Sequence, residues 1–146
     1  MLVVADVSLL VEALTKTGPD GDRYRSWLTE LANGELVETV RNLTYLEVIS
    51  ALRKLNAKDA ISNDLAAHAI DMFLQLPTRR REITQTMARR IWELRFNVTA
   101  YDAAYVALVE RLMSDDRRSD VVLATLDQRL AATPGLSIRI ITPEDH

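Results

Sequence analysis

The sequence contains no cysteine and only two histidines, His68 and His146. Without cysteine the chain forms neither disulfide bonds nor thiolate metal sites. Two histidines are too few for a Ser-His-Asp triad or for an imidazole zinc site. His68 stands among alanines in a predicted helix, where a surface or packing role is roughly ten times more common than a ligand role. Any chemistry therefore has to come from carboxylates, hydroxyls and a bound cofactor or ion.

Long apolar runs are also missing, and none approaches the length of a membrane-spanning helix. Residues 1–6 carry no basic stretch ahead of their apolar side chains, so they predict a strand rather than a signal peptide. The 146 residues are 48% hydrophobic and 27% charged, which is typical of one globular domain. We expect a single domain over residues 1–146, with no membrane partner, in the cytoplasm.

Excess positive charge is the third absence, since 18 basic residues face 21 acidic ones and the net charge is −3. Phosphate binding favours positive charge, so the sum by itself argues against a nucleic-acid partner. The distribution matters more than the sum. Outside four acids that we assign below to one site, basic residues slightly outnumber acidic ones. A nearly neutral body with one acidic pocket is compatible with a polyanionic substrate, provided that cations fill the pocket.

Short apolar segments alternate with helical patterns along the whole chain. The strands are predicted at 3–5, 36–40, 82–84, 121–125 and 138–141. The helices are predicted at 7–14, 24–32, 44–55, 61–76, 85–96, 99–113 and 127–132, with a turn at 18–22 and a polar loop at 114–120. Asn42 or Thr44 is the expected cap of the third helix. This alternation predicts an α/β fold with a central parallel sheet of about four or five short strands, flanked by helices on both faces.

Three acids stand where such a sheet binds its ligands, at the carboxyl ends of its strands. Asp6 directly follows the first strand, and Asp127 follows the strand at 121–125 by two residues. Asp102 lies in the first turn of the helix that starts at Thr99. Each acid also suits a helix cap, Asp102 as the capping-box partner of Thr99. Taken singly, capping is about twice as common as catalysis at such positions.

A fourth acid, Glu47, lies in a helix that is apolar on nearly all sides, between Leu46 and Val48. None of the residues one helical turn away is basic, so no local salt bridge accounts for it. Those residues are Leu43, Thr44, Ser50 and Ala51. A carboxylate in such a place is costly to bury unless it is paired or binds a metal. The four acids taken as a set predict one shared site.

Convergence of carboxylates calls for a cation. Two carboxylates ~5 Å apart repel by about 3 kcal/mol at an effective dielectric constant near 20. Four of them raise one another's pKa values unless a cation intervenes. Ligation by oxygen alone selects hard ions, Mg²⁺ or Mn²⁺. Such an ion lowers the pKa of a bound water and neutralises charge on a phosphoryl group.

At these residues the chain resembles the PIN domain and, within it, the VapC-type toxins of bacterial toxin–antitoxin systems. Residues 3–11 resemble the family's apolar strand followed by Asp-x-Ser, and residues 45–53 its helix with one embedded glutamate. Residues 94–108 resemble its most distinctive stretch, with Tyr-Asp-Ala, and residues 123–130 its Thr-x-Asp strand end. The resemblance covers nearly the whole chain in order and spacing.

The resemblance implies an endoribonuclease that hydrolyses RNA through a water activated by Mg²⁺ or Mn²⁺. It also implies a homodimer that a small antitoxin inhibits by covering the active-site groove. The catalytic, metal-binding acids implied are Asp6, Glu47, Asp102 and Asp127. Ser8 and Thr125 are implied as supporting polar groups.

Arginine clusters are the candidates for contacts with RNA phosphates. The clusters are Arg79, Arg80 and Arg81, then Arg89 and Arg90, then Arg117 and Arg118. A solvated surface is about twice as common for any one cluster. Arg53, six residues beyond Glu47, either approaches the pocket or pairs with Asp59.

The aromatic residues are predicted mainly as packing groups. Trp27, Phe73 and Trp92 occupy apolar helix faces, which predicts core, dimer or antitoxin contacts. Tyr101 and Tyr105 flank the Asp102 turn, where packing against the sheet is favoured over base stacking.

Two other functions stay open on the sequence. A phosphoacceptor signalling module also has an aspartate after its first strand, but it needs adjacent acids there and a lysine after a late strand. Ala5 precedes Asp6, and no lysine follows Lys58. A non-catalytic binding module, with the acids as caps, predicts no binding of Mg²⁺ or Mn²⁺.

Overall fold

The structure, a computed structural model, describes residues 1–115, 117 and 120–145. Within them five strands form one parallel sheet in the order β3-β2-β1-β4-β5. The strands are β1 (Leu2–Ala5), β2 (Val37–Val40), β3 (Thr78–Arg81), β4 (Val121–Ala124) and β5 (Arg139–Ile141). The predicted α/β class, with a parallel sheet of four or five strands, is confirmed.

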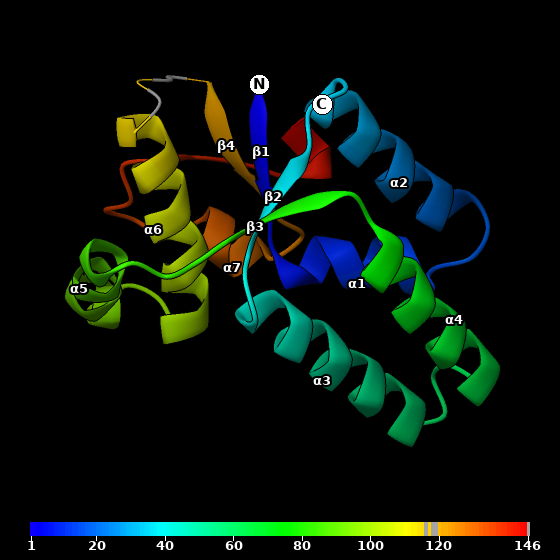
Figure 1. Cartoon of the computed structure of the whole chain (residues 1–146). Helices are drawn as coiled ribbons and strands as arrows, with labels where there is room; N and C mark the ends of the chain where they lie inside the picture. The colour runs from blue at the N-terminus through cyan, green and yellow to red at the C-terminus, as the bar shows by residue number, and fades with distance from the viewer. Residues whose placement is uncertain (116, 118–119, 146) are drawn as a thin grey trace.

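Helices cover both faces of the sheet, with α1 to α4 on one side and α5 and α6 on the other (Figure 1). The helices are α1 (Val7–Thr15), α2 (Pro19–Ala32), α3 (Leu43–Ala57), α4 (Asn63–Gln75), α5 (Gln85–Glu93), α6 (Ala100–Asp115) and α7 (Gln128–Ala131), with the 3₁₀ turns η1 (Leu94–Phe96) and η2 (Pro143–Asp145). No helix of the described residues is long and apolar enough to cross a bilayer.

β1 and β4 are apolar at every position because both of their faces are covered. In β1, Leu2 and Val4 pack toward α6, whereas Val3 and Ala5 pack toward α1 and α2. The four residues of β4 alternate in the same way. This alternation is the period of two of an extended chain. The parallel pairing of β1 with β4 places the ends of both strands at one edge of the sheet.

The turn predicted at 18–22 is wrong beyond its first residue, because α2 already begins at Pro19. Proline suits the first helical position, and the acids Asp20 and Asp22 favour the helix dipole there. Gly18, with φ of 74°, makes the actual bend. Gly21 is required by packing, since a Cβ atom on it would lie 2.1 Å from the carbonyl oxygen of Lys16.

The strand predicted at 82–84 is also wrong, because β3 lies at Thr78–Arg81 and contains the arginine run itself. β3 is an edge strand that pairs only with β2, and edge strands tolerate charged side chains. A buried acid on β2 makes the arginines stable there, as described below.

Three further sequence predictions concern segment ends. Asn42, one of the two expected caps, occupies the N-cap position of α3, but its side chain makes no capping hydrogen bond. Thr44 lies inside the helix, where its hydroxyl accepts from the Val40 amide at 3.1 Å. The loop predicted at 114–120 starts later, because α6 continues to Asp115. Positions 116, 118, 119 and 146, and with them Arg118 and His146, lie outside the described residues.

Candidate active site

The candidate site lies at the carboxyl edge of the sheet, where β1 and β4 end together. Ala5 of β1 is in register with Ala124 of β4, and the amide of Asp6 donates to the Ala124 carbonyl at 3.3 Å. Asp6 and Thr125 are therefore neighbours although 119 positions separate them. The same edge faces the start of α6 and the short helix α7 (Figure 1).

Asp6 is held by hydroxyl groups on both of its carboxylate oxygens. Ser8 donates to Oδ1 at 2.6 Å, and Thr125 donates to Oδ2 at 2.5 Å. Oδ1 also accepts from the Leu9 amide at 3.3 Å, so Asp6 caps α1 as well. Burial raises the pKa of the Asp6 carboxyl, the three hydrogen bonds oppose that rise, and the charge of Asp102 adds to it. Ser8 and Thr125 are thus hydrogen-bond partners of Asp6, and their supporting role at a catalytic pocket stays a prediction.

Glu47 reaches this edge from α3 and is partly buried. Its Oε1 accepts from the hydroxyl of Tyr105 at 3.2 Å, and that hydroxyl lies 2.9 Å from Oγ1 of Thr44. Burial raises the pKa of Glu47, as do the charges of Asp102 and Asp6, while the Tyr105 hydrogen bond opposes them. Burial also raises the pKa of the Tyr105 phenol, which keeps it a hydrogen-bond donor.

Asp102 and Asp127 come from the starts of α6 and α7. Burial raises the pKa of Asp102, a hydrogen bond with Thr99 opposes this, Asp127 raises it further and Arg129 lowers it. Oδ1 of Asp127 accepts from the amides of Arg129 at 2.9 Å and Leu130 at 3.4 Å, so Asp127 caps α7. Asp6 and Asp127 are therefore helix caps, and their site role stays a prediction that capping does not exclude.

The four predicted acids are close enough to act on one another's charge. The interacting pairs are Asp6–Asp102, Asp6–Glu47, Glu47–Asp102 and Asp102–Asp127. Three of the four carboxyls have raised pKa values with burial as the largest cause. All four side chains offer only oxygen atoms as ligands, and the raised pKa values mean that the carboxylate forms are disfavoured. A hard divalent cation prefers oxygen ligands and would stabilise these carboxylate forms.

The side chains of the four acids do not all point to one position where a single ion could bind them. Among residues 1–115, 117 and 120–145, no three acid or histidine side chains are grouped so that they could hold a metal. Several of the carboxylate oxygens instead accept hydrogen bonds, from the hydroxyls of Ser8, Thr125 and Tyr105 and from the first turn of α7. A cation would have to compete with these donors, so the predicted metal site stays a prediction.

A cavity of about 430 Å³ opens beside two of the acids, Asp102 and Asp127. Arg95, Phe96 and Arg129 are among the side chains that line it. The Arg129 guanidinium Nε lies 3.7 Å from Oδ1 of Asp127. The hollow thus combines carboxylates with cations, which suits a ligand that carries negative charge next to the acids.

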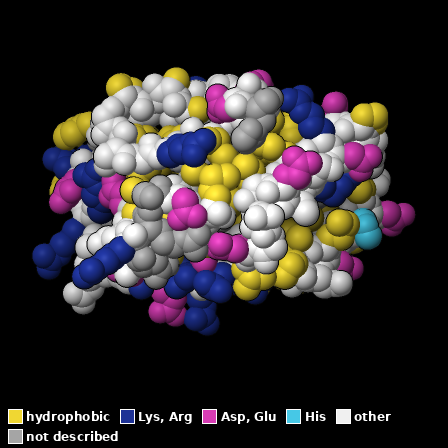
Figure 2. Space-filling view, turned by 90° about the horizontal axis from the view of Figure 1, so that it is seen from above, with side chains coloured by type: hydrophobic (Ala, Val, Ile, Leu, Met, Phe, Trp, Pro, Cys, Tyr) yellow, Lys and Arg dark blue, Asp and Glu magenta, His cyan; other side chains and the backbone are white. Residues whose placement is uncertain are grey.

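Charge is distributed differently on the opposite face. Figure 2 shows the molecule from the amino ends of the strands, where basic and acidic side chains are interspersed. That face has no field of a single sign in this view.

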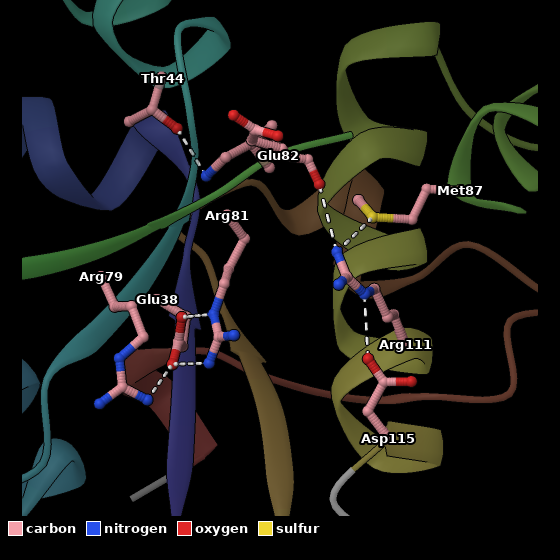
Figure 3. Close-up of polar contacts among 9 residues, drawn as sticks. Glu38, Thr44, Arg79, Arg81, Glu82, Met87, Arg111 and Asp115 are labelled. Atoms are coloured by element: carbon pink, nitrogen blue, oxygen red, sulfur yellow. Dashed lines mark hydrogen bonds and ion pairs between the residues drawn. The ribbon is translucent and has the colours of Figure 1, made fainter. Parts of the chain in front are cut away.

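The arginines of β3 have structural partners. Arg81 contacts Glu38 through Nε at 2.8 Å and Nη2 at 3.1 Å, and Arg79 Nη1 lies 3.3 Å from the same carboxylate (Figure 3). Arg80 points to the other face, with its guanidinium 4.6 Å from the ring centre of Tyr45. These contacts favour a structural role, and an RNA-phosphate role for Arg79, Arg80 and Arg81 stays a prediction.

Arg53 is exposed on α3, and no ion pair joins it to Asp59 within the described part of the chain. Of its two expected roles, contact with a ligand at the pocket is the one that remains a prediction. His68 is exposed on α4, in agreement with the expected surface role.

The aromatic predictions divide. Trp27 and Phe73 are buried in the core, whereas Trp92 is exposed. Tyr105 is buried as expected, but Tyr101 is exposed, so its predicted packing against the sheet is wrong. Tyr101 lies in the first turn of α6 on the side opposite to the core, which Ala103 and Ala104 face.

Sequence reasoning missed several groups around the site. Tyr105 and Thr44 fix Glu47, but their positions relative to it depend on contacts between α3 and α6 that no local spacing reveals. Arg129 follows Asp127 by two residues, and Arg95 lies in the quoted Tyr-Asp-Ala stretch. Both arginines lie within a few residues of a predicted acid in the sequence, and this spacing could have indicated that they border the site.

Comparison with known proteins gives close relatives over most of the chain. Ribonuclease VapC1 of Mycobacterium tuberculosis is 37% identical over 140 residues, which cover 94% of this chain and 94% of that protein. The VapC ribonuclease Mb0985 of Mycobacterium bovis is 31% identical over 132 residues, covering 90% and 91%. No protein-family model matches the chain.

Solved structures agree in fold. VapBC2 from Rickettsia felis, bound to a DNA fragment from its promoter, superposes with a TM-score of 0.66 at 14% identity, over 97% of this chain and 98% of that one. The sarcin-ricin loop cleaving toxin VapC20 of Mycobacterium tuberculosis gives 0.61 at 16% identity, over 89% and 93%. The acids at the carboxyl edge, the parallel sheet and relatives that match nearly end to end lead to one conclusion: the chain belongs to the VapC family of PIN-domain ribonucleases.

Proposed function

We propose that this protein is an endoribonuclease toxin that depends on Mg²⁺ or Mn²⁺ and hydrolyses RNA phosphodiester bonds through a metal-activated water. The observation that carries the proposal is the placement of the buried Asp6 and the partly buried Glu47 and Asp102 at a single edge of the sheet, where burial raises the pKa of each carboxyl. A protein gains no stability from gathering ionisable acids there, so a ligand that favours their charged forms accounts for the arrangement.

Asp6, Glu47, Asp102 and Asp127 would hold the ion. When bound, the ion supplies a water of lowered pKa and neutralises charge on the phosphoryl group. Ser8 and Thr125 orient the carboxylate of Asp6 through both of its oxygens. Tyr105, itself placed by Thr44, orients Glu47 in the same way. Arg129 and Arg95 line the adjacent cavity and would attract the substrate's phosphates.

We also propose the partners that the family resemblance implies: an RNA substrate, a small antitoxin that covers the active-site groove, and a second copy of this chain in a homodimer, all in the cytoplasm. Support for an antitoxin comes from the similarity to the toxin of a VapBC complex. Phosphoacceptor activity at Asp6 is disfavoured, because only 4% of this residue is exposed and both carboxylate oxygens accept hydrogen bonds.

Replacement of one acid tests the proposal. The antitoxin-free chain should cleave total RNA in Mg²⁺ or Mn²⁺, and Asp102→Asn should lower the rate at least about a hundredfold, since a catalytic metal supplies several kcal/mol of charge stabilisation. Asp115→Asn, at the far end of the same helix, is the matched control and should retain the rate. If folded Asp102→Asn stays fully active in Mg²⁺, the proposal is wrong. Mapping of the new RNA ends would define the cleaved bond.

A further inference from the structure

Two large aromatic rings stand in water a short distance along the chain from the candidate acids. Trp92, at the end of α5, is 67% exposed, and Phe96, in η1, is 86% exposed. The other tryptophan and the other phenylalanine of the chain are buried in the core. Single exposed apolar residues are common on proteins, but two rings within five positions form a distinct feature.

Arg95 joins the two rings into one unit. Its guanidinium carbon lies 4.4 Å from the ring centre of Trp92 and 4.5 Å from that of Phe96. Arg95 also donates from Nη1 to the Trp92 carbonyl at 3.1 Å, which fixes the side chain on the turn. Cation–π contacts of this kind hold planar groups in place without covering their outer faces. We call Trp92, Arg95 and Phe96 the aromatic platform.

The aromatic platform borders the candidate site. Arg95 and Phe96 line the same cavity of about 430 Å³ as Asp102 and Asp127. Arg129 lies across this cavity, with nearly all of its side chain in solvent. A ligand that contacts the acids therefore has an exposed ring and two guanidinium groups within the same hollow.

We propose that the aromatic platform is a base-stacking subsite, which takes an unpaired nucleobase adjacent to the phosphodiester that is cut. This inference rests on the ribonuclease function proposed above. Aromatic rings and guanidinium planes stack on bases only where the bases are not already stacked in a duplex. The subsite thus selects single-stranded or looped RNA over helical RNA.

Charge favours RNA over a protein segment as the occupant. Arg95 and Arg129 attract phosphates on either side of a stacked base and repel a basic peptide. A base also covers the outer face of Phe96 with a planar group of similar size, which aliphatic side chains do not match. Stacking of one base commonly contributes enough to change affinity by about tenfold or more.

Binding measurements with matched probes test the subsite. Fluorescence anisotropy would be measured in Mg²⁺ with Asp102→Asn as background, so that RNA is not cut. The probes are a single-stranded oligoribonucleotide, an abasic oligomer of equal length and charge, and a duplex. Phe96→Leu should weaken binding of the single strand about tenfold and leave the abasic oligomer unchanged. Phe96→Tyr, which keeps the ring, should retain affinity.

A control and a second signal separate stacking from other effects. Leu36→Ala removes an exposed apolar side chain at the amino end of β2, far from the acids, and should change neither affinity. The emission of exposed Trp92 should be quenched by the single strand but not by the abasic oligomer. Thermal unfolding and molar mass are measured for each variant.

Three results would overturn the subsite. In the first, Phe96→Leu binds the single strand as tightly as the chain with Phe96 does; in the second, its affinities for the single strand and the abasic oligomer fall equally. In the third, Phe96→Leu turns a dimer into a monomer while its affinity for RNA is unchanged, which assigns the rings to a protein contact. Failure of the proposed function is a separate outcome, in which the unsubstituted chain does not cut RNA in Mg²⁺ or Mn²⁺. Cleavage by that chain combined with unchanged binding by Phe96→Leu rejects only the subsite.

Discussion

Glu38 and the acids at the carboxyl edge of the sheet are carboxylates in two opposite environments. Glu38 lies on β2 with 0% of its surface exposed, and Arg79 and Arg81 of the neighbouring strand surround its oxygens. The edge acids are less deeply buried on the whole, yet their main polar partners are hydroxyls and backbone amides. Arginines of the chain itself neutralise the charge of Glu38, whereas most of the edge acids have no such cationic partner among the described residues.

The difference shows how a structural acid is told from a functional one. Arginine forks satisfy Glu38 bidentately, so no ligand is needed there. At the edge, burial and mutual repulsion raise the pKa of Asp6, Glu47 and Asp102, as expected if a bound ion completes the site that we propose. Loss of the charge should therefore destabilise the fold at Glu38 and stabilise it at Glu47, an edge acid that caps no helix.

The largest effect on stability is expected at Glu38. Glu38→Ala leaves a cavity and removes the partner of two arginines, and breaking a buried ion pair costs about 3–5 kcal/mol. Because Arg79 and Arg81 still reach water, we expect the lower end of this range. Denaturant unfolding would measure the loss. Glu82→Ala removes the partner of Arg41 in an exposed pair and should cost below about 1 kcal/mol, so equal losses would contradict the comparison.

Metal addition should act only at the carboxyl edge. Mn²⁺ at about one hundred times its dissociation constant would stabilise the fold by about 2.7 kcal/mol, because the ion binds only the folded chain. This corresponds to a rise in Tm of roughly 5–10 °C. The rise should shrink in Asp102→Asn and persist in Asp115→Asn. A calorimetric titration without heat, together with an unchanged Tm, would count against the metal site.

Removal of one edge charge should stabilise the metal-free protein. The pKa of Glu47 is raised in the fold, so folding favours its protonated form. The stability linked to this group is fully present below the unfolded pKa of about 4.3 and is lost as the pH rises through the folded pKa. Glu47→Gln should therefore raise the free energy of unfolding at pH 7, measured by denaturant unfolding. The gain should be on the order of 1 kcal/mol, since water screens a group that is only partly buried.

The pH dependence provides the control for Glu47→Gln. Below about pH 4 both forms of the chain carry a neutral side chain at this position, so their stabilities should approach each other. A substitution that destabilised the metal-free protein at pH 7 would show that ionised Glu47 stabilises the fold, and the contrast with Glu38 would disappear.

Sequence patterns predicted the sheet because its signals are local. Apolar runs at β1 and β4 and the acids that follow them are visible within a few residues, and the rule for parallel sheets then places Asp6 near Asp127. Glu47 was predicted from what it lacks, a basic neighbour on its own helix. Asp6, Ser8 and Thr125 accordingly lie together as expected.

Contacts between residues that lie far apart in the sequence could not be predicted from local patterns. Glu38 was not singled out, because its arginine partners lie 41 and 43 positions away on another strand. The same arginines lie in a charged run, which by itself predicts a surface loop rather than β3. Tyr105 reaches Glu47 across 58 positions. In each case the fold, and not the local pattern, selects the partner.

The smallest expected effect concerns Arg53, an exposed arginine on the same helix as Glu47. Arg53→Ala should leave the free energy of unfolding within about 0.5 kcal/mol, because the side chain is in solvent. If it contacts an RNA phosphate, the slope of log affinity against log salt should become shallower by about one. Glu38 substitution should leave that slope unchanged wherever the chain remains folded. An identical slope for Arg53→Ala would remove Arg53 from the RNA-binding surface and confine the contacts to the cavity lined by Arg95 and Arg129.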